Sequence, residues 1–120
     1  MAVILIIDDS PTELHLFQNM LEKNGFETLV ADSGEEGLRQ AQSSRPDCIL
    51  MDVVMPGMNG FQATRQLSKN PATSAIPVVM VTTKDQETDR IWGLRQGAVG
   101  YLMKPVGDDE LVAAVRANIA

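Results

Sequence analysis

Residues that build disulfides and histidine metal centres are nearly absent from this sequence, which has one cysteine and one histidine among 120 residues. A single cysteine cannot form a disulfide within the chain, and a single histidine cannot build a multi-histidine metal site. Cys48 lies inside an apolar run, so we expect a small buried core side chain there. His15 falls on a predicted helix, where we expect it on a solvated face. Disulfide-stapled folds and histidine-rich metal centres are therefore excluded.

Positive charge and long apolar stretches are also scarce. Ten Lys and Arg residues against sixteen Asp and Glu residues give a net charge of −6, and no basic cluster interrupts the chain. We therefore expect no nucleic-acid partner. No apolar stretch approaches the roughly 18 residues of a membrane helix, and the N-terminus lacks the basic region and cleavage site of a signal peptide. We expect a cytoplasmic protein that does not insert into membranes.

The chain does have enough apolar residues for one domain with a real core, since 44% of its 120 residues are hydrophobic. Strand and helix patterns alternate about five times, which is typical of βαβ units and a parallel sheet. We therefore expect a single α/β domain over residues 1–120, without a separate output domain.

Helix starts are well marked in two places. Ser10-Pro11-Thr12-Glu13 and Ser33-Gly34-Glu35-Glu36 each place a serine three residues before a glutamate, the spacing of a capping box. Spacing of apolar residues and the positions of glycine and proline then predict the helices. They are expected to begin after Ser10 and to span about 33–43, 61–69, 86–96 and 108–118.

Four apolar runs stop at polar residues, and this is the most informative pattern in the chain. The carboxyl ends of parallel strands lie along one edge of a sheet, where ligands of open α/β sheets bind. We therefore expect three carboxylates, a hydroxyl and an ammonium group to converge in one shallow crevice beneath the turn-rich 53–60 loop. The runs are Val3–Ile7 before Asp8 and Asp9, Cys48–Met51 before Asp52, Val78–Val81 before Thr82, and Val99–Met103 before Lys104 and Pro105.

Three neighbouring carboxylates need a compensating cation, because two unit charges 4 Å apart repel by about 4 kcal/mol at an effective dielectric of about 20. Mg²⁺ suits an all-oxygen site of this kind. Lys104 can pair with Asp52 or with a phosphoryl group, and Thr82 can donate a hydrogen bond to a phosphoryl oxygen. These parts match phosphoryl transfer to a carboxylate, with Asp52 as the nucleophile and Asp8 and Asp9 as metal holders.

Plainer interpretations exist for each of these residues. Asp-Asp-Ser-Pro before a helix is commonly only a cap, and a strand-end threonine or a Lys-Pro turn is commonly structural. Their joint occurrence at four strand ends favours function. A flavodoxin-like cofactor binder remains an alternative, although no glycine-rich phosphate cradle follows the first strand. A Mg²⁺-dependent phosphohydrolase with an aspartyl-phosphate intermediate remains another, although no cap domain is evident.

From Ile6-Ile7-Asp8-Asp9-Ser10 through Met103-Lys104-Pro105, the chain resembles the CheY-like receiver domains of two-component response regulators. The resemblance covers essentially all of the chain and implies a doubly wound five-stranded parallel sheet of order 2-1-3-4-5, flanked by five helices. A pseudo-receiver would be expected to have lost a site residue, and none is lost. The resemblance also implies roles for individual residues: Asp52 as phosphoacceptor, Asp9, Asp52 and the backbone carbonyl of Val54 as Mg²⁺ ligands with Asp8 acting through water, Thr82 and Lys104 as switch hydroxyl and phosphate-binding lysine, Tyr101 as aromatic switch, and a cis bond before Pro105.

Such a protein is expected to act as a phosphoacceptor regulator, not as an enzyme in the ordinary sense. A histidine kinase would phosphorylate Asp52, and the change would be read by a downstream protein on the fourth helix, fifth strand and fifth helix. Trp92 could anchor a partner there, but packing against the sheet is favoured. The 59–67 and 81–89 segments resemble stand-alone regulators of type IV pilus twitching motility, which implies a chemotaxis-like kinase. Another CheY-like role or a phosphate sink stays open, as does a monomer or a weak dimer.

Overall fold

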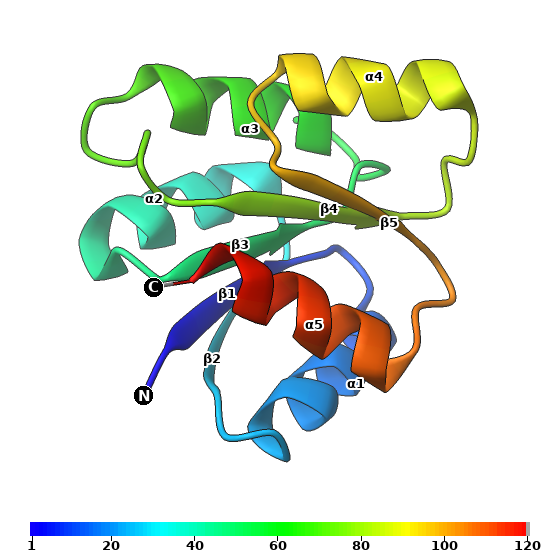
Figure 1. Ribbon diagram of the computed structural model, residues 1–120. Helices are drawn as coiled ribbons and strands as arrows, with labels where there is room; N and C mark the ends of the chain where they lie inside the picture. The colour runs from blue at the N-terminus through cyan, green and yellow to red at the C-terminus, as the bar shows by residue number, and fades with distance from the viewer. Residues whose placement is uncertain (120) are drawn as a thin grey trace.

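The apolar runs form the strands of one parallel sheet in the computed structural model, which describes residues 1–119 (Figure 1). The sheet has five strands in the order β2-β1-β3-β4-β5, which confirms the expected doubly wound topology. In register, Ile7 lies opposite Ala31 on one side and Met51 on the other, so neighbouring strands end together. The strands are β1 (Val3–Ile7), β2 (Glu27–Ala31), β3 (Cys48–Met51), β4 (Val78–Thr82) and β5 (Gly100–Met103).

Five helices cover the two faces of the sheet. In Figure 1, α1 and α5 lie on one face, and α2, α3 and α4 lie on the other. The described helices are too short or too polar to cross a membrane. Their bounds are α1 (Pro11–Glu22), α2 (Gly34–Ser44), α3 (Gly60–Lys69), α4 (Glu87–Arg95) and α5 (Asp108–Asn118).

Alternating side chains of the central strands divide the core into two layers. In β1, Ile4 and Ile6 join the cluster beneath α1 and α5, whereas Leu5 and Ile7 join the cluster beneath α2 and α3. Both layers are buried, which explains why the central strands read as continuous apolar runs instead of alternating ones. Cys48 is fully buried, and burial raises the pKa of its thiol to about 12. That placement confirms its expected role as a core residue.

Element bounds differ from the sequence expectation by one residue at several points. Strand β4 extends through Thr82, because Thr82 is in register with Met103 of β5. Helix α4 is shorter than expected at both ends, since Gln86 and Gln96 are its cap residues. His15 is exposed on α1, as expected.

The capping boxes expected from the serine and glutamate spacing are wrong in their second half. Ser10 does cap α1, because its Oγ accepts a hydrogen bond from the Glu13 N–H at 3.3 Å. The reciprocal bond does not form, since the Ser10 N–H donates to Asp8 Oδ1 at 2.9 Å and the Glu13 carboxylate lies 3.3 Å from Lys104 Nζ. Ser33 likewise caps α2 through its hydroxyl alone. The Glu13 carboxylate therefore faces the strand-end crevice and does not bond to the N-terminus of its own helix.

Candidate functional site

Three carboxylates meet at the ends of β1 and β3. One oxygen each of Asp8, Asp9 and Asp52 lies within 4.8 Å of the others. Asp8 and Asp52 are buried, with exposed fractions of 2% and 8%, whereas Asp9 is exposed. The aligned ends of β1 and β3 bring these three carboxylates together, as predicted from the apolar runs that stop at polar residues. The site is thus an acidic crevice with a buried floor and an open side.

Lys104 supplies the positive charge at this crevice. Its Nζ lies 2.8 Å from Asp8 Oδ2, 3.3 Å from Glu13 Oε1 and 3.7 Å from Asp52 Oδ1. The expected pairing with Asp52 is present but is the longest of the three contacts. Burial lowers the pKa of the Lys104 ammonium group, but the hydrogen bond to Asp8 and the nearby carboxylates outweigh it and hold that pKa above its usual value. Lys104 is therefore a fixed cation shared among carboxylates.

Glu13 also lies at the crevice, although the sequence pattern did not indicate it. The Ser-Pro-Thr-Glu spacing had assigned this residue to the helix cap, where its carboxylate would point back to Ser10. The signal available in the sequence was position, since a residue in the first turn of a helix that follows β1 lies near the strand-end edge. The structure places it there, in contact with Lys104.

Asp52 carries charge that its surroundings compensate only partly. Burial, followed by the charge of Asp8, raises the pKa of its carboxyl group to about 6, although Lys104 and a hydrogen bond from the Val53 N–H act in the opposite direction. The Val53 N–H donates to Asp52 Oδ1 at 2.9 Å. A carboxyl group with these surroundings ionises more readily when a further cation binds beside it.

The donor set fits a hard divalent cation such as Mg²⁺. Three carboxylates without histidine or thiolate ligands favour a hard cation bound through oxygen. The partly uncompensated charge at Asp52 points to the same conclusion. Val54 follows two residues later, in the loop between β3 and α3, with its side chain 56% exposed. Cavities of about 280 Å³ flank this loop and the Lys104 side of the crevice.

Thr82 and Tyr101 lie on the β4–β5 side of the crevice. Thr82 is fully buried, its Oγ1 accepts a hydrogen bond from the Lys84 N–H at 3.3 Å, and its carbonyl accepts one from the Lys104 N–H at 2.8 Å. The Tyr101 hydroxyl donates to the Lys84 carbonyl at 2.9 Å. Burial, followed by the charge of Asp89, raises the pKa of the Tyr101 phenol to about 12. Tyr101 and Thr82 are therefore both hydrogen-bonded to the backbone of Lys84.

The Lys104–Pro105 peptide bond is cis, as the resemblance implied.

Trp92 does not pack against the sheet, so that expectation is wrong. Its exposed fraction is 49%, and the sheet-facing position belongs to its neighbour Gly93. A Cβ on Gly93 would lie 2.7 Å from Met80 Sδ and 3.3 Å from Cδ2 of the Tyr101 ring. A larger residue at position 93 would require the Met80 side chain to shift, and Gly93 is the residue that α4 buries against the sheet, whereas Trp92 meets solvent.

Comparison with known proteins agrees with the fold and the crevice. A family model described as response regulator receiver domain matches residues 4–116. The chain belongs to this family, which confirms the resemblance seen in the sequence. It is 58% identical to Protein PilH of Pseudomonas aeruginosa over 120 residues, which are 100% of this chain and 99% of that protein. These findings place the chain among two-component signalling regulators, a class apart from classical enzymes.

Solved structures give the same result. The Vibrio cholerae chemotaxis protein CheY4 matches with a TM-score of 0.93 and 31% identity, over 99% of both chains. The receiver domain of sensor histidine kinase PA1611 from Pseudomonas aeruginosa matches with a TM-score of 0.90 and 28% identity, over 98% of this chain and 96% of that one. That structure has a magnesium ion coordinated in its active site cleft. Neither the cofactor binder nor the phosphohydrolase considered above is favoured by these matches.

Proposed function

We propose that this chain is a single-domain response regulator that accepts a phosphoryl group on Asp52. The observation that carries the proposal is the arrangement at the strand ends, where three carboxylate oxygens lie within 4.8 Å of one another and Lys104 Nζ is 3.7 Å from Asp52 Oδ1. A carboxylate nucleophile beside a metal-binding pair and a fixed cation is what phosphoryl transfer to aspartate requires. A structural cap alone would not bring the four residues together.

In the proposed reaction, a carboxylate oxygen of Asp52 attacks the phosphorus of a kinase phosphohistidine. The P–O bond to Asp52 forms as the P–N bond breaks, and the electron pair of that bond stays with the leaving imidazole. Lys104 is positioned to offset charge on the phosphoryl oxygens, because its ammonium group already faces Asp52. Asp9, Asp52 and the backbone carbonyl of Val54 would hold Mg²⁺, with Asp8 acting through water. The bound ion supplies positive charge that offsets repulsion between the carboxylate and the phosphoryl group.

Phosphorylation is proposed to switch the face formed by α4, β5 and α5. A phosphoryl group adds a charge of about −2 and new acceptor oxygens, which would draw Lys104 and the Thr82 hydroxyl toward Asp52. Thr82 Oγ1 now accepts from the Lys84 N–H, and the Tyr101 hydroxyl donates to the Lys84 carbonyl. Movement of Thr82 would break the first bond and free the Lys84 segment, which would in turn loosen the second. Tyr101 would then turn inward, and a downstream protein would read the change.

The decisive experiment is incubation of the protein with Mg²⁺ and acetyl phosphate, followed by measurement of the intact mass. We expect one added phosphoryl group on wild type, and none on Asp52→Asn or when EDTA replaces Mg²⁺. Asp47→Asn is the matched control, because it removes the same charge from an exposed residue that precedes β3, at the opposite edge of the sheet from the crevice. It should be phosphorylated like wild type. Absence of an adduct on wild type, or an equal adduct on Asp52→Asn, would refute the assignment.

We propose further that the protein acts in the cytoplasm as a regulator of type IV pilus twitching motility. Support comes from 58% identity to Protein PilH over the full length of this chain. The expected phosphodonor is therefore the chemotaxis-like histidine kinase of a type IV pilus system. Purified kinases of the pilus and flagellar systems from one bacterium provide the comparison. Transfer to this protein should be at least about tenfold faster from the pilus kinase, a difference of about 1.4 kcal/mol in activation free energy. Equal rates, or a faster flagellar kinase, would contradict the pathway assignment.

A further inference from the structure

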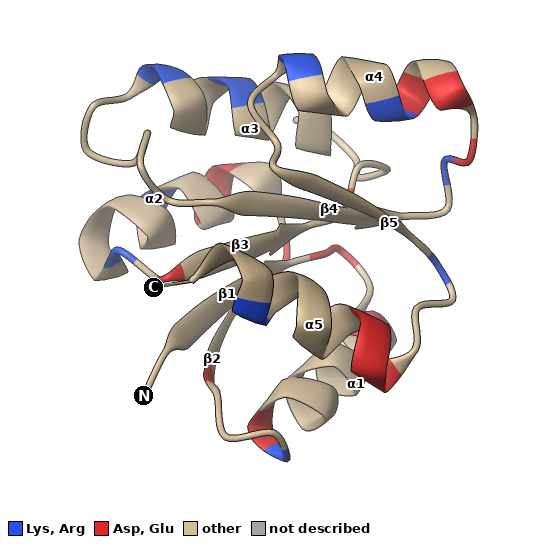
Figure 2. Cartoon of the chain, in the orientation of Figure 1, with Lys and Arg blue, Asp and Glu red and all other residues tan. Residues whose placement is uncertain are grey.

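Positive charge without a partner gathers on α3 and on the end of α4, although the chain carries a net charge of −6. Within residues 1–119, five of the ten Lys and Arg residues form ion pairs, and three of the remaining five are Arg65, Lys69 and Arg95. All three are exposed. Figure 2 shows α3 and the C-terminal end of α4 with basic residues and no acidic ones. These three residues form a patch of positive charge without ion-pair partners on an otherwise acidic protein.

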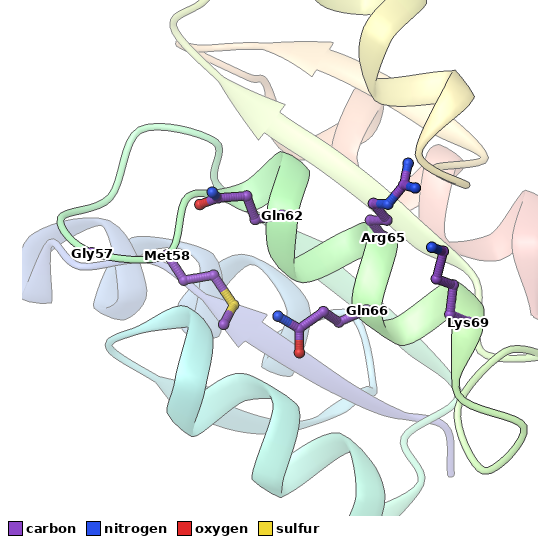
Figure 3. A pocket seen from close by; sticks show the side chains of 6 residues that line it. All are labelled: Gly57, Met58, Gln62, Arg65, Gln66 and Lys69. Atoms are coloured by element: carbon purple, nitrogen blue, oxygen red, sulfur yellow. The ribbon is translucent and has the colours of Figure 1, made fainter.

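The exposed side of α3 forms one continuous polar stripe. Gln62, Arg65, Gln66 and Lys69 stand at positions i, i+3, i+4 and i+7, so they share a helix face, and all four are exposed. With Met58 and Gly57 they line an open cavity of about 520 Å³ (Figure 3). In Figure 3, Arg65 points toward α4, while Met58 and Gln66 lie on the side nearer α2. The stripe offers two cations and two amides, and Met58 adds one apolar side chain beside it.

Trp92 lies on the side of α4 that faces α3. Gly93 contacts Tyr101 of β5, whereas Gln96 contacts α3, because its carbonyl accepts from Ser68 Oγ at 2.8 Å and its Oε1 lies 3.5 Å from Arg65 Nη1. At about 100° per residue, Gln96 is turned about 60° from Gly93, and Trp92 is turned about 40° further in the same direction. Trp92 therefore flanks the α3 side of the helix, away from the β5 side that the proposed switch uses.

We propose that the exposed stripe of α3 together with Trp92 is a docking surface for an acidic protein segment with an apolar anchor residue. The occupant follows from charge, since the two cations of the stripe have no carboxylate partner within residues 1–119 and the helix itself carries none. Arginine and tryptophan are the side chains that most often carry binding energy at protein interfaces. Electrostatic complementarity then selects an acidic partner.

The stripe on α3 lies outside both the Asp52 crevice and the α4-β5-α5 face, and Trp92 joins it from the side of α4 that faces α3. A partner held there could stay bound whether or not Asp52 is phosphorylated. One partner could then hold the protein at the α3 surface while a downstream protein binds the α4-β5-α5 face. It goes beyond the phosphoacceptor role and does not depend on it.

The test uses two synthetic helical peptides with leucine at every fourth position and either glutamate or glutamine elsewhere. Anisotropy of fluorescein-labelled peptide gives the affinity, and emission of Trp92, the only tryptophan, reports contact with unlabelled peptide. The glutamate peptide should bind at least about tenfold tighter than the glutamine peptide at low salt, with a shift of Trp92 emission to shorter wavelength. The R65E/K69E double variant should lose at least about tenfold in affinity.

The matched control is K23E/R116E, which changes the net charge by the same amount at the end of α1 and on α5, on the opposite face of the sheet from α3 (Figure 1). It should bind the glutamate peptide within about twofold of wild type. Both double variants should still be phosphorylated by acetyl phosphate, so a failure of docking is distinguishable from a failure at Asp52. The proposal is overturned by equal loss in the two double variants or by unchanged Trp92 emission. Self-association of wild type that R65E/K69E abolishes would also overturn it, by assigning the surface to a second copy.

Discussion

Replacing Gly60 with alanine is expected to lower the free energy of unfolding by about 3 kcal/mol, although the added group is a single methyl. An ideal Cβ at this position would lie 2.1 Å from the Asp52 carbonyl oxygen and 2.8 Å from Val53 Cα. Both are backbone atoms next to the end of β3, so they cannot rotate away as a flexible side chain would. The Gly60 N–H also donates to the Val53 carbonyl at 2.9 Å, which fixes the start of α3 against the crevice.

Gly107 provides the matched control for this substitution. It is the N-cap residue of α5, and an ideal Cβ there meets nothing within 4 Å. Gly107→Ala should change the free energy of unfolding by less than about 1 kcal/mol. Urea denaturation of the three proteins measures the difference. Equal stabilities of Gly60→Ala and Gly107→Ala would show that the contact with the Asp52 backbone relaxes at little cost. Phosphorylation by acetyl phosphate should also slow in Gly60→Ala, because a shifted backbone moves the Asp52 carboxylate.

Of the two loop glycines, the sequence predicts the structural role of Gly57 but not that of Gly60. Gly57 and Gly60 both mark a turn after β3, and the sequence predicts a loop there. Gly57 does have the positive φ of 73° that such a turn requires. The need for glycine at Gly60 has another origin, which is the close approach of helix and strand backbones. Close approach depends on packing distances that no local pattern contains.

Strand ends were predictable, but charge pairing across the crevice was not. Apolar runs that stop at polar residues follow directly from a parallel sheet buried on both faces, so Asp8, Asp9 and Asp52 could be placed together. Which carboxylate Lys104 contacts depends on side-chain reach from three different elements. The structure gives Asp8 the shortest contact and adds Glu13 from α1. Helical periodicity likewise could not orient α4, because that helix buries only Gly93.

Asp52→Asn is expected to raise the free energy of unfolding at pH 7.5 in EDTA by up to about 3 kcal/mol. The pKa of the Asp52 carboxyl group is raised from 3.8 to about 6, chiefly by burial and then by the charge of Asp8. Each unit of difference between folded and unfolded states is worth about 1.4 kcal/mol. Asparagine keeps an oxygen that can accept the hydrogen bond from the Val53 N–H, so the substitution removes the charge and preserves the contact.

The sign of this effect sets its pH dependence. Well below pH 3.8 the Asp52 carboxyl group is protonated in both states and contributes no difference. Between pH 3.8 and about 6 the folded state holds the proton more tightly, so the contribution of Asp52 to stability falls as pH rises. Above about pH 6 Asp52 is ionised in the folded protein, where its charge is unfavourable. The full difference in free energy of unfolding between wild type and Asp52→Asn appears there.

Mg²⁺ should reverse the order of stability, because binding to the folded state stabilises it and requires the Asp52 carboxylate. Urea denaturation at pH 4 and pH 7.5, each with EDTA or with Mg²⁺, gives the comparison. Asp52→Asn should exceed wild type in EDTA at pH 7.5, match it at pH 4, and gain less than wild type from Mg²⁺. Asp47→Asn should follow wild type throughout, since its carboxylate is exposed at the opposite edge of the sheet and asparagine keeps an oxygen that can accept from the Val3 N–H. A stability of Asp52→Asn equal to or below that of wild type in EDTA at pH 7.5 would mean that the crevice already balances the charge of Asp52. The unfavourable charge of Asp52 in the acidic crevice is therefore measurable without any phosphodonor, because it lies on the same carboxylate that the proposed reaction uses.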